Sequence, residues 1–64
     1  MEHAAAELSS VGSQLEDLTR RVTDVAVGYE KGGREDVGHE LFEVERALRT
    51  AQRRLNRAMR DARS

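Results

Sequence analysis

The sequence contains no cysteine, no proline and no tryptophan, and its 64 residues include one tyrosine and one phenylalanine. Without cysteine the chain has no disulfide framework, and a cysteine-rich zinc site is excluded. No apolar run approaches the ~20 residues that a membrane-spanning helix needs. These absences remove three classes of protein from consideration: disulfide-stabilised domains, cysteine-ligated zinc modules and helical membrane proteins.

The first ten residues, MEHAAAELSS, are acidic and lack the basic and then apolar layout of a signal peptide. We therefore expect a cytoplasmic protein. A length of 64 residues allows one small domain. We expect residues 1–64 to form a single helical-hairpin domain, for the reasons that follow.

Apolar residues recur at alternating steps of four and three in two blocks of the chain. The first block comprises Ala4, Leu8, Val11, Leu15, Leu18, Val22, Val25 and Tyr29. The second comprises Val37, Leu41, Val44, Leu48, Ala51, Leu55, Ala58 and Ala62. This is the heptad pattern of a coiled coil, whereas a β-strand would alternate with a period of two. The sequence predicts an all-α protein.

Four glycines in the segment GYEKGGREDVG separate the two blocks. Two of them, Gly32 and Gly33, are adjacent and suit the left-handed cap that ends a helix. Glu35 and Asp36 suit the first turn of a following helix, because the helix dipole favours acids there. We predict helices near residues 3–31 and 34–62.

The two apolar stripes match each other when the chain is folded back about Gly33. Each residue of one stripe then meets a residue of the other at the same distance from Gly33, as Val22 meets Val44 and Leu18 meets Leu48. Every such pair sets an a position against a d position, as an antiparallel coiled coil requires. The sequence predicts an antiparallel two-helix hairpin with heptad packing.

A second stripe, of small residues, runs beside the first stripe of the N-terminal block. Ala5, Gly12, Thr19 and Ala26 recur every seven residues. A lone hairpin buries too little apolar surface to offset the entropy of ordering its chain, and small residues let another helix approach closely. We expect these four residues to mediate self-association into a homodimeric four-helix bundle. The alternative is that alanine and threonine are simply common in helices.

Groups that could perform catalysis or bind a metal are not suitably arranged. His39 has acids at helical spacings of three and four, namely Glu35, Asp36 and Glu43. It falls on the far side of the helix from the apolar stripe, whereas the metal sites of helical bundles project into the core. No serine has a histidine and base nearby, and GYEKGG is not a phosphate-binding loop. We expect no enzyme activity, no cofactor and no metal.

Residues 46–63 contain seven arginines and one acid. Helical spacing puts most of these arginines on one face, opposite the stripe of Leu48, Leu55 and Ala62. An exposed apolar residue, Phe42, lies off the same stripe. The candidate partner-binding residues are therefore Phe42, Arg46, Arg49, Arg53, Arg57, Arg60 and Arg63.

Three interpretations of this basic face remain open: a solvated helix surface, a site for an acidic protein partner, and a site for nucleic acid. An isoelectric point near 6.1 and the lack of aromatic residues among the arginines count against nucleic acid. A membrane surface is not expected, because the hairpin already uses the apolar stripe. We expect a non-enzymatic protein–protein interaction module, a small regulator or adaptor, with an RNA- or DNA-binding hairpin dimer as the alternative.

Overall fold

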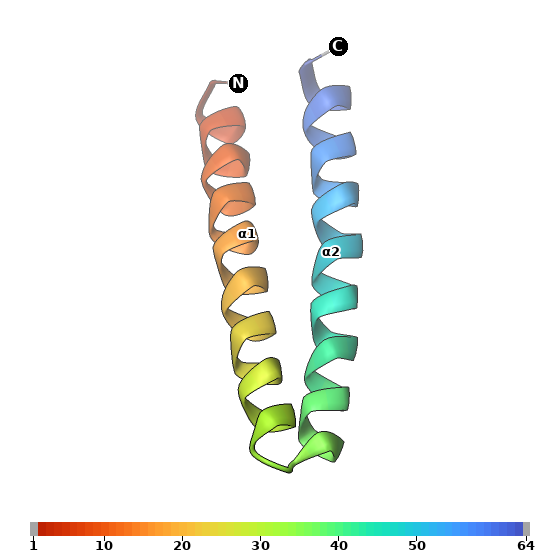
Figure 1. Cartoon of the computed structure of the whole chain (residues 1–64). Helices are drawn as coiled ribbons and strands as arrows, with labels where there is room; N and C mark the ends of the chain where they lie inside the picture. Colours follow the sequence, from red (N-terminus) through yellow and green to blue (C-terminus); the bar gives the residue numbers. More distant parts are fainter. Residues whose placement is uncertain (1, 64) are drawn as a thin grey trace.

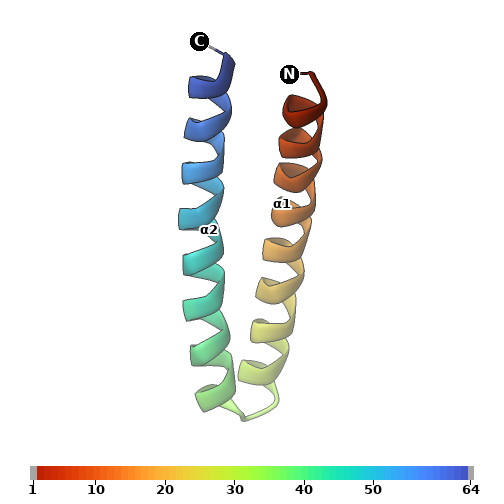
Figure 2. The same cartoon turned by 180° about the vertical axis from the view of Figure 1, so that it is seen from behind.

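The computed structural model describes residues 2–63, which form two helices joined by a short turn. Helix α1 spans Glu2–Lys31 and helix α2 spans Glu35–Arg63. The helices run antiparallel and side by side, so the start of α1 and the end of α2 lie at the same end of the molecule (Figures 1 and 2). The hairpin extends 48 × 15 × 9 Å. Residues 2–63 contain no strand, and both predicted helices are confirmed with ends within one residue of the predicted ones.

The turn follows from the two adjacent glycines. Gly33 has a positive φ of 87°, a backbone conformation that residues with a Cβ rarely adopt. With Gly33 in this conformation, its N–H donates to the carbonyl oxygen of Glu30 at 3.3 Å and the N–H of Arg34 donates to that of Tyr29 at 2.8 Å. These two bonds make the Schellman motif, which satisfies the last free carbonyl groups of α1.

Helix α2 begins directly after this motif. The carbonyl oxygen of Arg34 accepts the first bond of the new helix, from the N–H of Gly38 at 3.1 Å. The guanidinium group of Arg34 donates to both carboxylate oxygens of Asp36, at 3.2 and 3.3 Å. These bonds, together with the backbone N–H of Val37, lower the pKa of Asp36. An acid in the first turn also interacts favourably with the helix dipole.

The most buried residues lie between the helices and are small. Among the residues whose burial is described, 3–63, only Gly12, Thr19, Ala26 and Gly38 are buried, and no large side chain is fully buried. A Cβ atom placed on Gly38 would lie 3.1 Å from the carbonyl oxygen of Ala26. The two backbones therefore approach closely near the turn, and the hairpin closes on small residues.

Larger residues of both helices are half-buried around this contact. They are Leu8, Leu15, Val22, Thr23 and Val27 of α1, and Val37, Leu41, Phe42, Glu45, Leu48, Gln52, Leu55 and Met59 of α2. The helices are in the predicted register. Thr23 meets Glu45, and a Cβ atom on Gly12 would lie 3.7 Å from Leu55. In each pair the two residues lie almost equally far along the chain from Gly33, as the predicted register requires.

The rotation of α1 about its own axis differs from the prediction. Five of the eight residues in the apolar stripe that was expected to face α2 are exposed instead, as in Leu18 at 47% and Val25 at 51%. Gly12, Thr19 and Ala26, which were expected to face a second hairpin, face α2 of the same chain. Small side chains let the two backbones come together along the middle of the hairpin, and the larger side chains of α1 are turned to one flank.

Candidate functional site: two interaction surfaces

One side of the hairpin carries large apolar side chains that are open to solvent. Their exposed fractions range from 43% to 51%, and they are Val11, Leu18, Val25, Tyr29 and Val44. We call this set the apolar face. The heptad pattern predicted that all five would lie in the closed seam between the helices, so their exposure was not predicted from the sequence.

The positions of these residues relative to the helix contact show that they share one side. Val11, Leu18 and Val25 each come one residue before a buried small residue of α1. On α2, Val44 comes one residue before the inward-facing Glu45. In an antiparallel pair of right-handed helices, the residue before an inward-facing one falls on the same side for both helices, because each residue advances by 100°. The apolar face therefore spans both helices.

Half-buried residues fill the apolar face between its two exposed rows. Leu15, Val22 and Leu48 lie there, and the small residues Ala51 and Ala58 continue the α2 row toward the open end of the hairpin. The face is thus continuous along the length of the molecule. A surface with this many neighbouring apolar side chains is unusual on a monomer and is typical of interaction sites.

The hairpin opens at the end far from the turn, where the helices diverge (Figure 1). A cleft there is lined mainly by small and apolar residues, namely Ala4, Ala5, Leu8, Ser9, Met59, Ala62 and Arg63. Ala5, the first residue of the small-residue stripe, is exposed at this cleft, unlike the three that follow it. Alanine side chains are too short to fill the space between the diverging helices.

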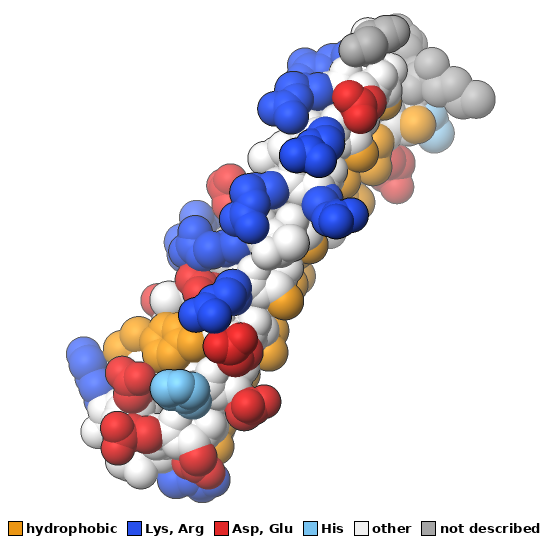
Figure 3. Space-filling model, turned by 90° about the vertical axis from the view of Figure 1, so that its right-hand side faces the viewer, with side chains coloured by type: hydrophobic (Ala, Val, Ile, Leu, Met, Phe, Trp, Pro, Cys, Tyr) orange, Lys and Arg blue, Asp and Glu red, His pale blue; other side chains and the backbone are white. Residues whose placement is uncertain are grey.

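The opposite side of the hairpin is basic. Arg49, Arg53 and Arg60 each come one residue after an inward-facing residue of α2, which places them across the hairpin from the apolar face. We call Arg46, Arg49, Arg53, Arg57, Arg60 and Arg63 the arginine surface. Figure 3 shows Lys and Arg side chains gathered along α2 toward the open end, with apolar side chains along the edge beside them.

Ion pairs along α2 engage part of this surface. Arg46 lies 3.5 Å from Glu43 and Arg49 lies 2.8 Å from Glu45, while Arg53 donates a hydrogen bond of 3.2 Å to the hydroxyl of Thr50. Arg46 and Glu43 are both exposed, so their ion pair contributes only ~0–1 kcal/mol to stability, whereas the carboxylate that pairs with Arg49 is half-buried. The exposed ion pair therefore adds little to the stability of the fold, and the side chains of Arg46, Arg49 and Arg53 are exposed to solvent.

A polar cluster crosses the helix contact beside the arginine surface. The Thr23 hydroxyl lies 3.1 Å from Oε2 of Glu45, which also accepts a hydrogen bond from Nε of Arg49. The bond from Arg49 is the main reason that the pKa of Glu45 is lowered; the Thr23 hydroxyl and the charges of Arg49 and Arg46 act in the same direction, and partial burial opposes them. The carboxylate of Glu45 is therefore held in its charged form between the helices.

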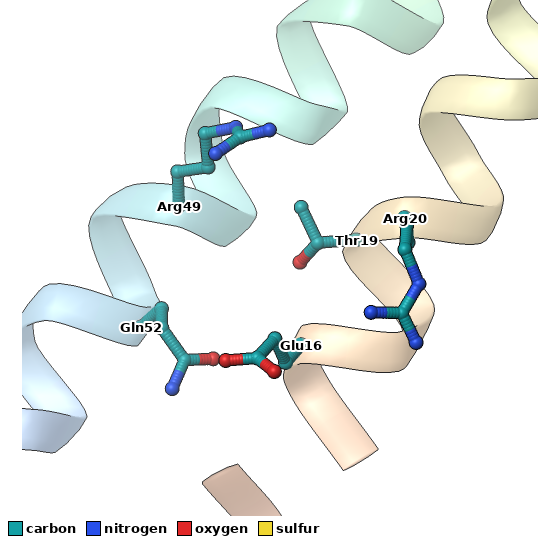
Figure 4. Close-up of a pocket in the computed structure, with 5 residues that line it drawn as sticks. All are labelled: Glu16, Thr19, Arg20, Arg49 and Gln52. Atoms are coloured by element: carbon teal, nitrogen blue, oxygen red, sulfur yellow. The ribbon is translucent and has the colours of Figure 1, made fainter. Parts of the chain in front are cut away.

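A groove next to this cluster runs between the helices and is lined by Glu16, Thr19, Arg20, Arg49 and Gln52 (Figure 4). In Figure 4 the side-chain oxygen of Gln52 points toward the carboxylate of Glu16. This oxygen, Oε1, is buried and has no hydrogen-bond partner. The NH₂ group of the same amide donates to Oδ1 of Asn56 at 3.4 Å, and turning the amide by half a rotation would direct it to Glu16 instead.

Other predicted positions are less available. Phe42 is half-buried rather than exposed, so only part of its ring could contact a partner. His39 is exposed. The described residues contain no group of three or more His, Cys, Asp or Glu side chains that could hold a metal ion. Neither helix, over the described residues, is long and apolar enough to cross a membrane.

Comparison with known proteins identifies no relative: no family model, no curated protein and no solved structure matches this chain.

Proposed function

We propose that this chain is a non-enzymatic protein–protein interaction module, a small regulator or adaptor that works as a homodimer of hairpins. In the dimer, the apolar faces of two copies pack together and complete a four-helix bundle with heptad-type packing. The observation that supports this proposal is the apolar face itself. Five large apolar side chains are 43–51% exposed in a hairpin whose described residues include no fully buried large side chain.

The size of the face fits a second copy of the chain. A surface of 48 × 15 Å would bury roughly 700 Å² on each hairpin, or roughly 1,400 Å² in total, which is within the range of stable protein–protein interfaces. A helix that is apolar on one stripe must cover that stripe with another element, and a second hairpin offers two helices of matching length.

The arginine surface lies on the side of the hairpin that the dimer leaves open, and we assign to it the binding of an acidic protein surface. Arg57 supports this assignment, because it forms no ion pair with any described residue. Nucleic acid is the alternative occupant of the same surface, since arginine side chains also suit phosphate groups. Affinity purification with and without nuclease separates the two, because only nucleic acid would be lost on digestion.

Sedimentation equilibrium at micromolar concentration tests the dimer. We expect about twice the chain mass for the natural sequence and the mass of one chain for Leu18→Glu, because a charge would be buried at the centre of the apolar face. The matched control is Ser13→Glu, which adds the same charge at an exposed position of α1 away from that face and should leave the dimer intact. A folded monomer of the natural sequence would contradict the proposal.

A further inference from the structure

The charges of α2 are separated into two blocks along its length. Residues 35–45 carry five acids and no base, whereas residues 46–63 carry seven arginines and one acid. Helix α1 shows no comparable separation. The charge difference between the two ends of the hairpin therefore comes from α2, which is acidic near the turn and basic near the open end. This distribution of charge favours one orientation of the two copies in the dimer over another. The inference rests on the proposed function, because it assumes that the dimer forms.

Two twofold arrangements bring apolar face against apolar face. If the twofold axis runs along the hairpin, the two turns lie at the same end and α1 of one copy covers α2 of the other. If the axis runs across the hairpin, the turns lie at opposite ends, and each helix covers its own counterpart in the antiparallel direction. Both arrangements are closed and self-complementary, as a symmetric dimer requires.

We propose that the dimer adopts the second arrangement, with α1 on α1, α2 on α2 and the turns at opposite ends. This arrangement sets the acidic block of each α2 at the same height as the arginine block of the other, twice by symmetry. Most of these arginines point away from the interface, and Arg54 lies at its rim. In the first arrangement the arginine block would face residues 3–20, which carry three acids and one base, and the acidic block would face residues 21–31, whose two acids and two bases cancel. Complementary charge therefore favours the second arrangement, because charge patterns set the register and orientation of an interface.

Two residues at the rim of the apolar face give this complementarity a specific contact. Glu40 and Arg54 lie fourteen residues apart on the same edge of α2, with Ala47 midway between them. Neither side chain forms an ion pair with any described residue of its own hairpin. Antiparallel pairing of α2 about Ala47 brings Arg54 to Glu40 of the partner subunit and Glu40 to Arg54 of the partner subunit.

Side-chain sizes on the apolar face suit the same pairing. On α2, Val37 and Val44 lie before the midpoint and the small residues Ala51 and Ala58 lie after it. Antiparallel pairing sets each valine against an alanine of the partner subunit, which keeps the layers between the helices equally filled. On α1, Leu18 lies at the height of Ala47 and Leu48, on the twofold axis.

Charge reversal at the rim tests the contact by measurement of the dimer dissociation constant. Arg54→Glu and Glu40→Arg should each weaken the dimer about tenfold, because each sets like charges side by side twice. The double variant should return to within about threefold of the natural chain, since it restores both pairs in reverse. If the double variant instead loses as much dimer affinity as the two single variants lose together, the two side chains do not meet and the proposed orientation is wrong.

Disulfide trapping tests the orientation directly, because the chain has no cysteine of its own. Leu18→Cys should oxidise to a covalent dimer, and Val11→Cys mixed with Val25→Cys should form the mixed disulfide. Val11→Cys alone should form no disulfide. The two cysteines of its dimer would lie ~21 Å apart at 1.5 Å per residue, which is beyond the reach of a disulfide.

The result that would overturn the orientation is a mixed disulfide between Val11→Cys and Ala58→Cys, which only the arrangement with both turns at one end allows. Sedimentation of the same cysteine variants under reducing conditions separates the two proposals. A dimer that gives the wrong disulfide contradicts the orientation alone, whereas a monomer contradicts the proposed dimer.

Discussion

The hydroxyl of Thr23 on α1 lies 3.1 Å from Oε2 of Glu45 on α2, and the same carboxylate oxygen accepts a hydrogen bond of 2.8 Å from Nε of Arg49. The Thr23 hydroxyl is also 3.1 Å from the carbonyl oxygen of Thr19. It has one proton, so it can donate to only one of these oxygens at a time. A charged carboxylate is the stronger acceptor, and the contact with Glu45 ties the two helices together at their half-buried edge.

The first prediction concerns the pH dependence of stability. The pKa of Glu45 is lowered in the folded chain, chiefly by Arg49, so below the ordinary glutamate pKa the unfolded state binds more protons than the folded state. The contribution of Glu45 is therefore present above pH ~4.3 and is lost as the pH falls through the lower, folded pKa. Thermal melts between pH 7 and pH 2.5 should show this loss.

Glu45→Gln should flatten that part of the pH profile, because the group that titrates is gone. Asp36→Asn is the comparison variant, since the pKa of Asp36 is also lowered but its bonds to Arg34 lie within the turn and the start of α2. Removing Asp36 should leave the part due to Glu45 in place. An unchanged acid profile in Glu45→Gln would show that Arg49 and Thr23 do not hold the carboxylate of Glu45 in its charged form.

The second prediction concerns two helical glycines with opposite surroundings. A Cβ atom on Gly38 would lie 3.1 Å from the carbonyl oxygen of Ala26, whereas a Cβ atom on Gly28 would meet nothing within 4 Å. Gly28→Ala should stabilise the chain by about 1 kcal/mol, the helix propensity of alanine over glycine. Gly38→Ala should destabilise it by ~1–3 kcal/mol, because the backbone of α1 must move away. Urea denaturation at one fixed protein concentration measures both, and a stabilised Gly38→Ala would contradict the close approach.

The third prediction concerns the amount of space at Gly12. A Cβ atom there would lie 3.7 Å from both Gln52 and Leu55, which is ordinary contact. Gly12→Ala should therefore raise the free energy of unfolding by up to ~1 kcal/mol, whereas Gly12→Leu should lower it, because the added atoms would force α2 away. If Gly12→Leu were the more stable of the two, Gly12 would not lie between the helices.

The fourth prediction separates binding from folding on the arginine surface. Replacing Arg53, Arg57 and Arg63 by Gln should cost little stability, because all three are exposed and none forms an ion pair with a described residue. The variant should still dimerise but lose an acidic partner, and binding by the natural chain should weaken with added salt. The control, Arg20, Arg21 and Lys31 changed to Gln, removes the same charge from α1. Equal loss of the partner in both variants would show that net charge, and not this surface, is recognised.

The sequence by itself determined the two helices, their ends and their register. Alternating steps of three and four define a helix through local geometry, and Gly32 and Gly33 end the first helix because the Schellman turn needs a residue with positive φ. The register of α1 against α2 follows from the same two glycines, since a short turn fixes which residues of the two helices lie side by side. Local chain geometry decides these features, so they are readable without the fold.

Only the tertiary structure decided which flank of each helix faces the other. On α1, the stripe of Val11, Leu18 and Val25 and the stripe of Gly12, Thr19 and Ala26 differ by one residue, a rotation of 100°, and both repeat every seven residues. The large residues alone predicted the wrong flank, because the sequence does not show how closely two backbones can approach. In the structure that approach is set by small residues on both helices, including Gly38 against Ala26, and it leaves the large apolar side chains exposed on one face.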